Sequence, residues 1–321
     1  MKALRLVGGA VLASATVICA AQGFPAKPVR IVSPYPPGGG NDTLARTIAP
    51  KLTELLKQQV IVENKPGANT IIGTEHVARS APDGYTMVLV PNSLAINPFL
   101  YPKIPYDAAR DFTPISLVGQ SPLVVAVHPS MPTKDVRALI DLARTRPTQV
   151  QYGSSGIGSV GHMSVSLLEM MTGARFQHSP YKGTAIMMQD VLSGQLTFTF
   201  TSALGVMPHV RSGRLRAIAV TGDKRSQALP DLPTVAESGK VPGYSFILWY
   251  GLLGPANLPA DVLARLNGDV GRTLQDADVR TRLGNQGVEA TPTTSKAFAE
   301  LIASDLRKYA KVVPASGAKA E

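Results

Sequence analysis

Apolar residues along this chain follow two kinds of spacing, which alternate from one end to the other. Short apolar runs have the length of buried strands, and they are separated by stretches with the 3.6-residue spacing of helices. The stretch 42–58 has clear helical spacing, with one apolar stripe at Leu44, Ile48, Leu52 and Leu55. Pro50 lies inside this stretch, so we expect the helix to bend or break there.

Together the two spacing patterns predict an α/β fold. The strand candidates are 29–33, 59–63, 86–90, 123–127, 149–152, 176–178, 196–201, 215–220 and 247–253. The helix candidates are 42–58, 71–79, 134–145, 161–172, 184–193, 203–212, 231–238, 259–276, 278–285 and 294–311. Regular alternation of this kind is typical of largely parallel sheets covered by helices. A hydrophobic content of 44% over this length supports two domains, each with its own core.

The loop after the first strand carries the most informative local pattern. The strand 29–33 is followed by a Pro-Pro turn and by three glycines, Gly38, Gly39 and Gly40, and a helix is expected to begin at Asn41 or Asp42. Free N–H groups and the positive end of a helix dipole then point the same way, which makes an anion cradle. The loop has no Lys and no Cys, so we expect it to hold a small anion by its backbone and to do no chemistry on it.

Three side chains in or beside this loop are expected to have different roles. Asn41 is expected to contact the anion directly, whereas Asp42 is expected to cap the helix, because a carboxylate would compete with a bound anion. Tyr35 is expected to wall a cleft, with packing against the bent helix as the alternative.

Loops after the later strands share the same polar composition. They are rich in Ser, Thr, Asn and Gly, and they lie at 91–98, 153–162, 179–184 and 201–203. Ligands of open α/β sheets bind at the carboxyl ends of strands, where all these loops are expected. Two facing sets of such loops predict a polar cleft between two lobes.

The first 21 residues have the features of a secretory signal. Lys2 and Arg5 precede an apolar core at 6–20, and the small residues Cys19 and Ala21 suit cleavage after Ala21. The core is short for a membrane anchor, and Ile18 is bulky for a lipidation site at Cys19. Because Cys19 is the only cysteine, the exported chain is expected to have no disulfide, no thiol nucleophile and no Cys-bound metal. We expect a soluble protein, since no second apolar span follows.

The chain is basic, with a formal net charge of +10. Lys2 and Arg5 contribute two of these charges, which leaves +8 after cleavage. The Lys and Arg residues are scattered and are not interleaved with aromatic residues, and there is one Trp. This pattern argues against binding of nucleic acid.

A G-x-G-x-x-G motif at Gly156, Gly158 and Gly161 follows one strand and precedes one helix. A dinucleotide site would need an acidic residue about 20 positions further on. The segment 176–182 offers none, so the sequence predicts no nicotinamide cofactor. The motif could instead hold a smaller anion at the start of helix 161–172, or it could be a tight turn.

Two further patterns could carry chemistry. Ser179 and Lys182 form S-x-x-K, which would bring an amine beside a hydroxyl on one helical turn, but the K-T-G and S-D-N partners are absent. An exported serine hydrolase that uses Ser179 and Lys182 is kept as the alternative function. No histidine has the spacing of a zinc site. His162 could bind a ligand or could order its loop by a local hydrogen bond, and Tyr250 could line the cleft or pack in the core.

An ordered series of short motifs resembles a known family. The motifs are 35–39 (Tyr-Pro-Pro-Gly-Gly), 63–68 (Glu-Asn-Lys-Pro-Gly-Ala), 81–86 (Ala-Pro-Asp-Gly-Tyr-Thr), 97–101 (Asn-Pro-Phe-Leu-Tyr), 153–156 (Gly-Ser-Ser-Gly), 180–183 (Pro-Tyr-Lys-Gly) and 229–237 (Leu-Pro-Asp-Leu-Pro-Thr-Val-Ala-Glu). In this order they resemble the Bug-type periplasmic solute receptors of tripartite tricarboxylate transporters. The resemblance covers nearly all of the chain after residue 21.

The resemblance implies a two-lobed periplasmic binding protein of the Venus-flytrap kind, similar to type II, with each lobe a mostly parallel sheet flanked by helices. Lobe one would comprise 22–122 and 245–321, and lobe two 123–244. The chain would be a periplasmic, monomeric receptor for a small carboxylate and not an enzyme. It would have no cofactor and no metal, and it would deliver its ligand to a membrane permease.

The resemblance and the loop chemistry together give a set of candidate ligand-binding residues. In lobe one these are Tyr35, Gly38, Gly39, Asn41, Asn92, Ser93 and Asn97. In lobe two they are Ser154, Ser155, Ile157, Ser159, His162, Lys182, Gly183, Thr201 and Ser202. Family members often have Asp-Asn where this chain has Thr201-Ser202. Loss of that carboxylate disfavours an amino acid's ammonium and favours a di- or tricarboxylate or an aromatic acid.

Overall fold

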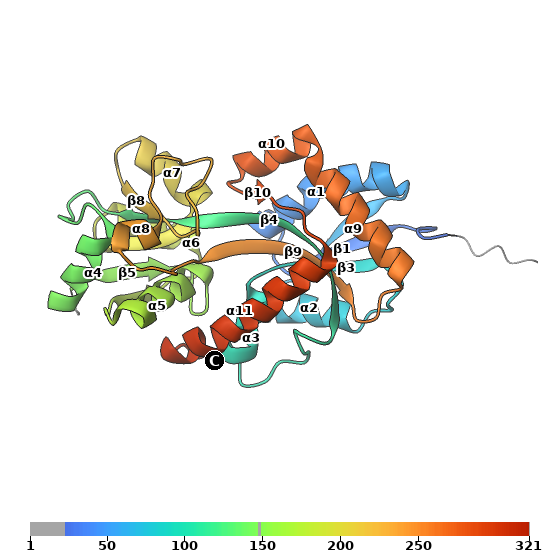
Figure 1. Ribbon diagram of the computed structural model, residues 1–321, viewed down its shortest axis with the longest axis horizontal. Helices are drawn as coiled ribbons and strands as arrows, with labels where there is room; N and C mark the ends of the chain where they lie inside the picture. The colour runs from blue at the N-terminus through green and yellow to red at the C-terminus, as the bar shows by residue number, and fades with distance from the viewer. Residues whose placement is uncertain (1–22, 147–148, 321) are drawn as a thin grey trace, which may run out of the picture.

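Two long strands carry the chain across the whole molecule in a computed structural model that describes residues 23–146 and 149–320 (Figure 1). β4 (Phe112–Val127) and β9 (Ile247–Pro255) pair antiparallel from Phe112 opposite Pro255 to Pro122 opposite Ile247. From Leu123 onward β4 pairs with other strands instead. β4 therefore belongs to both halves of one ten-stranded sheet.

The strands follow the order β2-β1-β3-β9-β4-β7-β5-β6, with β8 and β10 also paired to β4. We call the half around β1 lobe one and the half around β5 lobe two. The remaining strands are β1 (Val29–Ser33), β2 (Val60–Asn64), β3 (Thr86–Pro91), β5 (Gln151–Ser154), β6 (Gln177–Pro180), β7 (Phe198–Ser202), β8 (Arg216–Val220) and β10 (Glu289–Ala290).

Helices cover both faces of each half. They are α1 (Gly40–Leu56), α2 (Ile71–Ala78), α3 (Ser93–Leu100), α4 (Val136–Thr145), α5 (Val160–Thr172), α6 (Thr184–Leu192), α7 (Ala203–Arg211), α8 (Val235–Gly239), α9 (Ala260–Gln275), α10 (Ala277–Asn285) and α11 (Ser295–Ala315), with a short 3₁₀ turn, η1 (Ala68–Thr70). In lobe one, α1, α9 and α10 share one core cluster, and α2, α3 and α11 share another. In lobe two, α4, α5 and α8 pack on one face, and α6 and α7 on the other.

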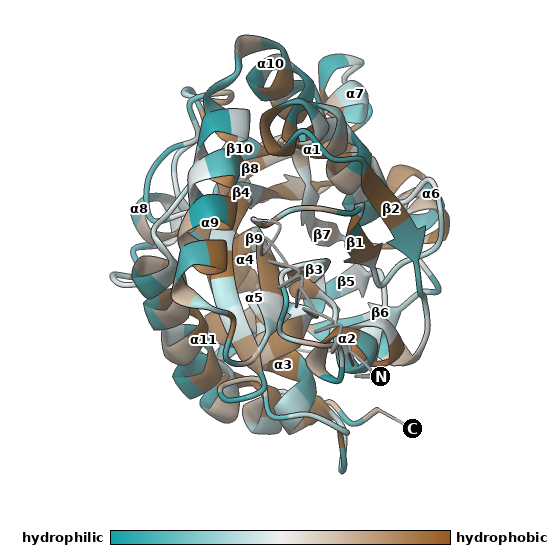
Figure 2. Ribbon diagram, turned by 90° about the vertical axis from the view of Figure 1, so that its right-hand side faces the viewer, coloured by the Kyte–Doolittle hydropathy of each residue, from teal (hydrophilic) through white to brown (hydrophobic). Residues whose placement is uncertain are grey.

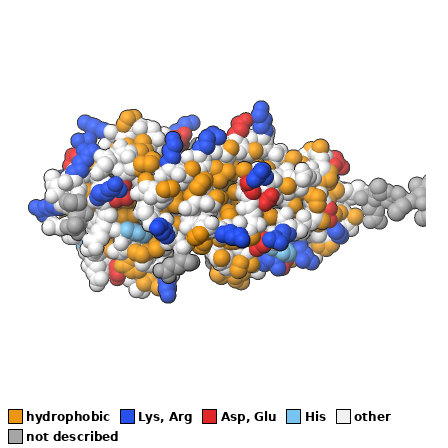
Figure 3. Space-filling view, turned by 90° about the horizontal axis from the view of Figure 1, so that it is seen from below, with side chains coloured by type: hydrophobic (Ala, Val, Ile, Leu, Met, Phe, Trp, Pro, Cys, Tyr) orange, Lys and Arg blue, Asp and Glu red, His pale blue; other side chains and the backbone are white. Residues whose placement is uncertain are grey.

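The colouring by hydropathy follows this layering (Figure 2). Brown segments gather at the central strands, and the covering helices α9 and α11 carry teal on their outer sides. Basic side chains are scattered among acidic and uncharged ones over the face seen from below (Figure 3).

The α/β fold predicted from the sequence is confirmed, with one correction to its sheets. Parallel pairing holds for β1 with β2 and β3, and for β5 with β6 and β7. The pairs made by β4 and β9 are antiparallel, so the sheet is mixed and not mostly parallel. The reason is that each of these two strands runs once between the lobes, in opposite directions.

Most predicted elements lie within a few residues of the observed ones. β10 and η1 were not predicted, and α3, β4 and α1 differ from the expectation. α3 was expected to be a loop, because Asn92, Asn97 and Pro98 read as turn residues. β4 begins at Phe112, well before the predicted 123, and its register with β9 shifts between Pro114 and Ser116 and between Leu117 and Gly119. α1 runs unbroken through Pro50, which lies on its exposed side, where water can reach the carbonyl group freed from the helix ladder.

Two further predictions concern the chain as a whole. The signal sequence at 1–21 lies outside the described residues. The division at 122/123 and 244/245 stays a prediction, although the partner of β4 changes between Pro122 and Leu123. Across residues 23–146 and 149–320, no helix is both long enough and apolar enough to cross a membrane.

A buried hydrogen-bond network fastens the crossing strand β9 to lobe one. Asn92, which is fully buried, donates from Nδ2 to the carbonyl of Ile247 (3.0 Å) and accepts from the backbone N–H of Trp249 (3.0 Å). The Trp249 indole N–H donates to Asp305 Oδ2 (2.7 Å), and Asn92 Nδ2 also reaches that oxygen (3.2 Å). Lys308 completes the cluster with an ion pair to Asp305 (2.8 Å). Asn92 thus holds the strand where it leaves lobe one, and it was wrongly placed among the candidate ligand contacts.

We expect Asn92→Ala to destabilise the protein by about 2–4 kcal/mol, because it leaves the buried Trp249 N–H and part of the Asp305 carboxylate without partners. Urea unfolding gives the change in the free energy of unfolding. Asn285→Ala, at the exposed end of α10, is the matched control and should change it by less than about 0.5 kcal/mol. An Asn92→Ala variant as stable as the control would contradict this role.

Candidate ligand-binding site

A cavity of about 400 Å³ lies between the two lobes. Its lobe-one wall includes Tyr35, Gly40, Asn41, Asn69 and Ser93, and its lobe-two wall includes 155–161, Thr184, Thr201 and Ser202. The apolar part of the lining comes from Pro91, Ile96, Leu123, Met187, Phe200, Leu248 and Tyr250. Among the residues that the structure describes, none with a charged side chain lines this cavity.

Several helices begin at the cavity. The first residues of α1 (Gly40), α3 (Ser93), α5 (Val160) and α6 (Thr184) all line it, and so does Ser202, which precedes α7. Within the described chain no side chain caps the N-terminus of α1, α3, α6 or α7. Their first-turn N–H groups and helix dipoles favour an anion in the cavity.

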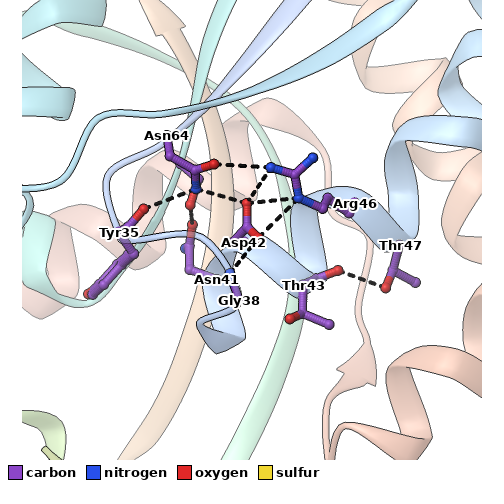
Figure 4. A network of polar contacts seen from close by, with 9 residues as sticks. Tyr35, Gly38, Asn41, Asp42, Thr43, Arg46, Thr47 and Asn64 are labelled. Atoms are coloured by element: carbon purple, nitrogen blue, oxygen red, sulfur yellow. Dashed lines mark hydrogen bonds and ion pairs between the residues drawn. The ribbon is translucent and has the colours of Figure 1, made fainter.

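The loop before α1 is held by a polar network behind the cavity (Figure 4). Asp42 accepts hydrogen bonds from the backbone N–H of Gly38 (2.8 Å), from Arg46 Nε (3.0 Å) and from Asn64 Nδ2 (2.8 Å). Asn64 Nδ2 also donates to the carbonyl of Tyr35 (3.0 Å). Burial of the Asp42 carboxylate acts against ionisation, but the hydrogen bonds from Arg46, Gly38 and Asn64 outweigh it and hold the pKa below its usual value. Asp42 lies in the first turn of α1 and fixes the loop before it. It was expected to cap the helix, but the N-cap position is Gly39, and no side chain makes a capping hydrogen bond there.

Asn41 differs from the expectation. Its Oδ1 accepts from Ser33 Oγ (2.8 Å), and its Nδ2 donates to the carbonyl of Leu89 (3.1 Å). The side-chain amide is therefore committed to the ends of β1 and β3, and the group that Asn41 can offer to the cavity is its backbone N–H.

Two phenol groups line the cavity. Burial raises the pKa of Tyr250 to about 12, and it raises the pKa of Tyr35 further, with a smaller contribution from the nearby Tyr250. Both hydroxyls stay neutral at physiological pH and can donate a hydrogen bond.

The lobe-two loop 155–159 is held from behind by two stacked histidines. His162 Nδ1 accepts the backbone N–H of Gly158 (3.1 Å), and His178 Nε2 lies 2.7 Å from Ser154 Oγ. The two imidazole rings stack with their centroids 4.0 Å apart. Burial lowers the pKa of His162 to about 3, with a further contribution from His178, and burial lowers the pKa of His178 to about 4. Of the two roles considered for His162, the structure shows the loop-ordering hydrogen bond.

Glycine is favoured at each of the three motif positions for a different steric reason. Gly158 has φ of +75°, and a Cβ there would overlap Leu100 Cδ2 of lobe one. A Cβ on Gly161 would lie 2.5 Å from the carbonyl oxygen of Phe200, so α5 approaches β7 closely. Gly156 has φ of +140°. The motif therefore shapes a tight turn and a contact between the lobes.

The structure brings half of the predicted ligand residues to the cavity. Those that line it are Tyr35, Asn41, Ser93, Ser155, Ile157, Ser159, Thr201 and Ser202. Those that do not are Gly38, Gly39, Asn92, Asn97, Ser154, His162, Lys182 and Gly183. Most of the second group support the wall from behind: Ser154 Oγ bonds to Gly156, for example, and Asn97 bonds to Asn69. Lys182 is exposed to solvent and sits outside the lining.

Several lining residues were not predicted. Asn69 had no signal in the sequence, because it lies in a loop that no motif marked. Leu123 and Leu248 belong to predicted strands, and their position in the cavity follows only from the meeting of β4 and β9 at its floor. Tyr250 lines the cavity, which was one of its two considered roles.

The pairing needed for the alternative hydrolase is not formed. Ser179 lies in strand β6 and Lys182 in the segment before α6, so the helical turn that S-x-x-K requires does not exist. In residues 23–146 and 149–320 there is no group of three or more His, Cys, Asp or Glu that could hold a metal ion.

Comparison with known proteins places these features in a family. The sequence model of the "Tripartite tricarboxylate transporter family receptor" matches residues 44–318. Protein BugT of Bordetella pertussis is 35% identical over 326 residues, which covers 99% of each chain.

Two solved structures are similar over most of the chain. Rpa4515 of R. palustris with adipate has 33% identity and a TM-score of 0.79, and the match covers 92% of this chain and 98% of that one. MatC of Rhodopseudomonas palustris with bound malate has 29% identity and a TM-score of 0.74, over 90% and 100% of the two chains.

The buried histidine pair predicts a loss of stability in mild acid. A histidine whose pKa is lowered on folding binds its proton only in the unfolded state, so its contribution is complete above about pH 6.5 and is lost as the pH falls toward the folded value. For His162 the free energy of unfolding should fall by up to about 1.4 kcal/mol per pH unit in that window.

Urea unfolding between pH 7 and 5 measures this slope. His162→Gln keeps an acceptor for the Gly158 N–H and should flatten the slope, whereas His76→Gln, at an exposed position on α2, should leave it unchanged. Equal slopes in wild type and His162→Gln would show that His162 does not titrate in this way.

Proposed function

Because the chain belongs to the tripartite tricarboxylate transporter receptor family, a family of periplasmic solute-binding receptors, we propose that it captures a small organic acid between its lobes and delivers it to a membrane permease. In this proposal the chain acts in the periplasm as a monomer, and it binds its ligand without chemical conversion.

The observation that carries the proposal is an uncharged cavity at which five helices begin. Backbone N–H groups can satisfy a carboxylate from several directions without the rigid geometry of an Arg fork. Hydrogen bonds to a charged group are worth about 1.5–3 kcal/mol each, and micromolar affinity needs about 8 kcal/mol. A handful of such donors therefore suffices after the costs of ordering and closure are subtracted.

The distribution of polar groups supports a ligand with two polar ends. Donor-rich segments face the cavity from both lobes, at Gly40 and Ser93 on one side and at Ser155, Thr184 and Ser202 on the other. Between them lie apolar side chains, among them Leu123, Phe200 and Leu248. A di- or tricarboxylate fits this arrangement, and the related Rpa4515 and MatC structures hold adipate and malate. An aromatic acid is the second member of the proposed class.

An amino acid fits less well. Its ammonium group would need a carboxylate partner, and no acidic side chain of the described residues lines the cavity. Thr201 and Ser202 lie in the lobe-two wall where family members often have Asp-Asn, and the missing carboxylate also argues against an amino acid as the ligand.

Contacts between the lobes suggest how binding is signalled. Gly158 of lobe two meets Leu100 of lobe one, and Ser226 Oγ donates to Glu289 Oε1 (3.2 Å) across the other lobe boundary. A ligand held by both walls would favour this closed arrangement over an open one, and the permease would recognise the closed form.

A thermal-shift screen tests the ligand class. We expect di- and tricarboxylates, or aromatic acids, to raise the unfolding temperature, because a ligand that binds only the folded state stabilises it by mass action. Sugars and metal cations serve as negative controls. A response to these controls, and none to any organic acid, would overturn the proposal.

Ser202→Asp tests the electrostatic account separately from folding. Aspartate is a good N-cap for α7, so the variant should keep its stability, yet the new carboxylate should repel a bound acid and weaken binding at least about tenfold.

Thr294→Asp makes a similar change at the N-cap of α11, away from the cavity lining, and should leave affinity unchanged. Titration calorimetry compares the two variants with wild type. Unaltered affinity in Ser202→Asp would show that no anion approaches the start of α7.

A further inference from the structure

The wall of lobe one contains an unusual stretch of backbone. Ala68, Asn69 and Thr70 have φ of 43°, 47° and 80°, so three consecutive non-glycine residues adopt the left-handed conformation. Elsewhere in the described chain such residues occur singly, at Lys57, Lys240 and Asn257. Left-handed backbone is unfavourable for residues with a Cβ, and it persists where the surroundings impose it, often at a functional site.

Neighbouring helices impose this conformation on the loop. Asn97 of α3 donates from Nδ2 to the carbonyl of Asn69 (2.8 Å), and its Oδ1 accepts from Asn69 Nδ2 (2.8 Å). Thr70 Oγ1 hydrogen-bonds to Ser93 Oγ (3.0 Å), and Thr74 Oγ1 donates to the Thr70 carbonyl (2.8 Å). Asn97 and Thr70 are buried, whereas Asn69 at the apex is exposed and lines the cavity.

These bonds fix the orientation of both amides. The Asn69 backbone carbonyl can only accept, so the atom of Asn97 that faces it must be Nδ2, and the other atom must be Oδ1. The Asn69 atom that meets Asn97 Oδ1 is then Nδ2. Two groups of the Asn69 side chain are left, the acceptor Oδ1 and the second N–H of Nδ2, and no hydrogen-bond partner among the described residues reaches either of them.

The free Oδ1 repels a carboxylate and accepts a hydrogen bond from a donor. A ligand hydroxyl can donate to Oδ1 and accept from the remaining N–H, so it matches both groups without a net positive charge. An ammonium would also donate, but it would lack an acidic partner among the described lining residues.

We infer that Asn69 is a specificity-determining residue that reads a hydroxyl group on the bound acid, so that the receptor prefers hydroxy-carboxylates to their unhydroxylated counterparts. The strained turn Ala68–Thr70 is what aims this residue. The inference rests on the proposed function and adds the substrate feature that lobe one selects.

The experiment compares matched acids by titration calorimetry. The pairs are succinate with malate, and adipate with 2-hydroxyadipate, so that chain length and hydroxylation are varied independently. Wild type should bind the hydroxylated member of the pair that fits about three- to tenfold more tightly, the value of one neutral hydrogen bond.

Asn69→Gly removes Oδ1 and relieves the left-handed strain at the same time. It should keep or raise the unfolding temperature and abolish the preference, so that the ratio of the affinities for the hydroxylated and the unhydroxylated acid falls to about one.

Asn257→Gly is the matched control, because the same residue type has φ of 64° on an exposed turn after β9. It should relieve the same kind of strain and leave the preference at its wild-type value. Should Asn69→Gly fail to fold, Asn69→Ala removes the same acceptor, and the same loss of preference is expected.

Two results would overturn the inference while the proposed function stands: wild type that binds acids without preferring a hydroxyl, or Asn69 variants that retain the preference. Failure of wild type to bind any organic acid in the wider screen would overturn both together.

Discussion

The cavity depends on the antiparallel pairing of β4 with β9. These strands carry the chain once in each direction between the lobes, and they remain paired until Pro122 meets Ile247. The cavity is lined at this place by Leu123, just beyond the last pair, and by Leu248 and Tyr250, which pair with Ser121 and Gly119. Because the two strands also anchor the neighbouring parallel strands, the loops at the strand ends of both lobes face one another across the cavity. Buried Asn92 and Asp305 hold β9 at this point through Trp249.

Carboxylate, guanidinium, imidazole and amide side chains support the site from outside the cavity lining. Asp42, Arg46 and Asn64 fasten the lobe-one loop, and His162 and His178 fasten the lobe-two loop, yet none of the five lines the cavity. The lining itself offers hydroxyls, amides and the beginnings of helices. A site of this kind attracts an anion through fixed backbone dipoles, and different acids can be accommodated when the intervening side chains change.

Sequence patterns predicted the fold and the strand ends of the site better than the individual contacts. The glycine loop before α1 and the Ser-Gly loop before α5 could be recognised from their composition. Positive φ angles favour glycine at Gly38 in the first loop and at Gly156 and Gly158 in the second. Polar residues in the segments that follow the strands were correctly recognised, among them Asn92, Asn97 and His162. Their side chains, however, form hydrogen bonds with β9, with Asn69 and with Gly158, respectively. Whether such a side chain faces the ligand or bonds to the protein itself depends on its neighbours in space. The spacing of residues along the chain does not determine those neighbours. Asn69 was missed for the opposite reason, since its left-handed backbone is imposed by a helix that the sequence did not predict.

A crystal structure of the protein with the acid that co-purifies with it, identified by mass spectrometry, tests the central claim most directly. The account predicts a carboxylate in the cavity between the lobes, with its oxygens within hydrogen-bond distance of first-turn N–H groups of helices such as α1, α5 or α7 and with no Lys or Arg beside them. A carboxylate paired with Lys182, or a ligand bound outside the cavity, would contradict it.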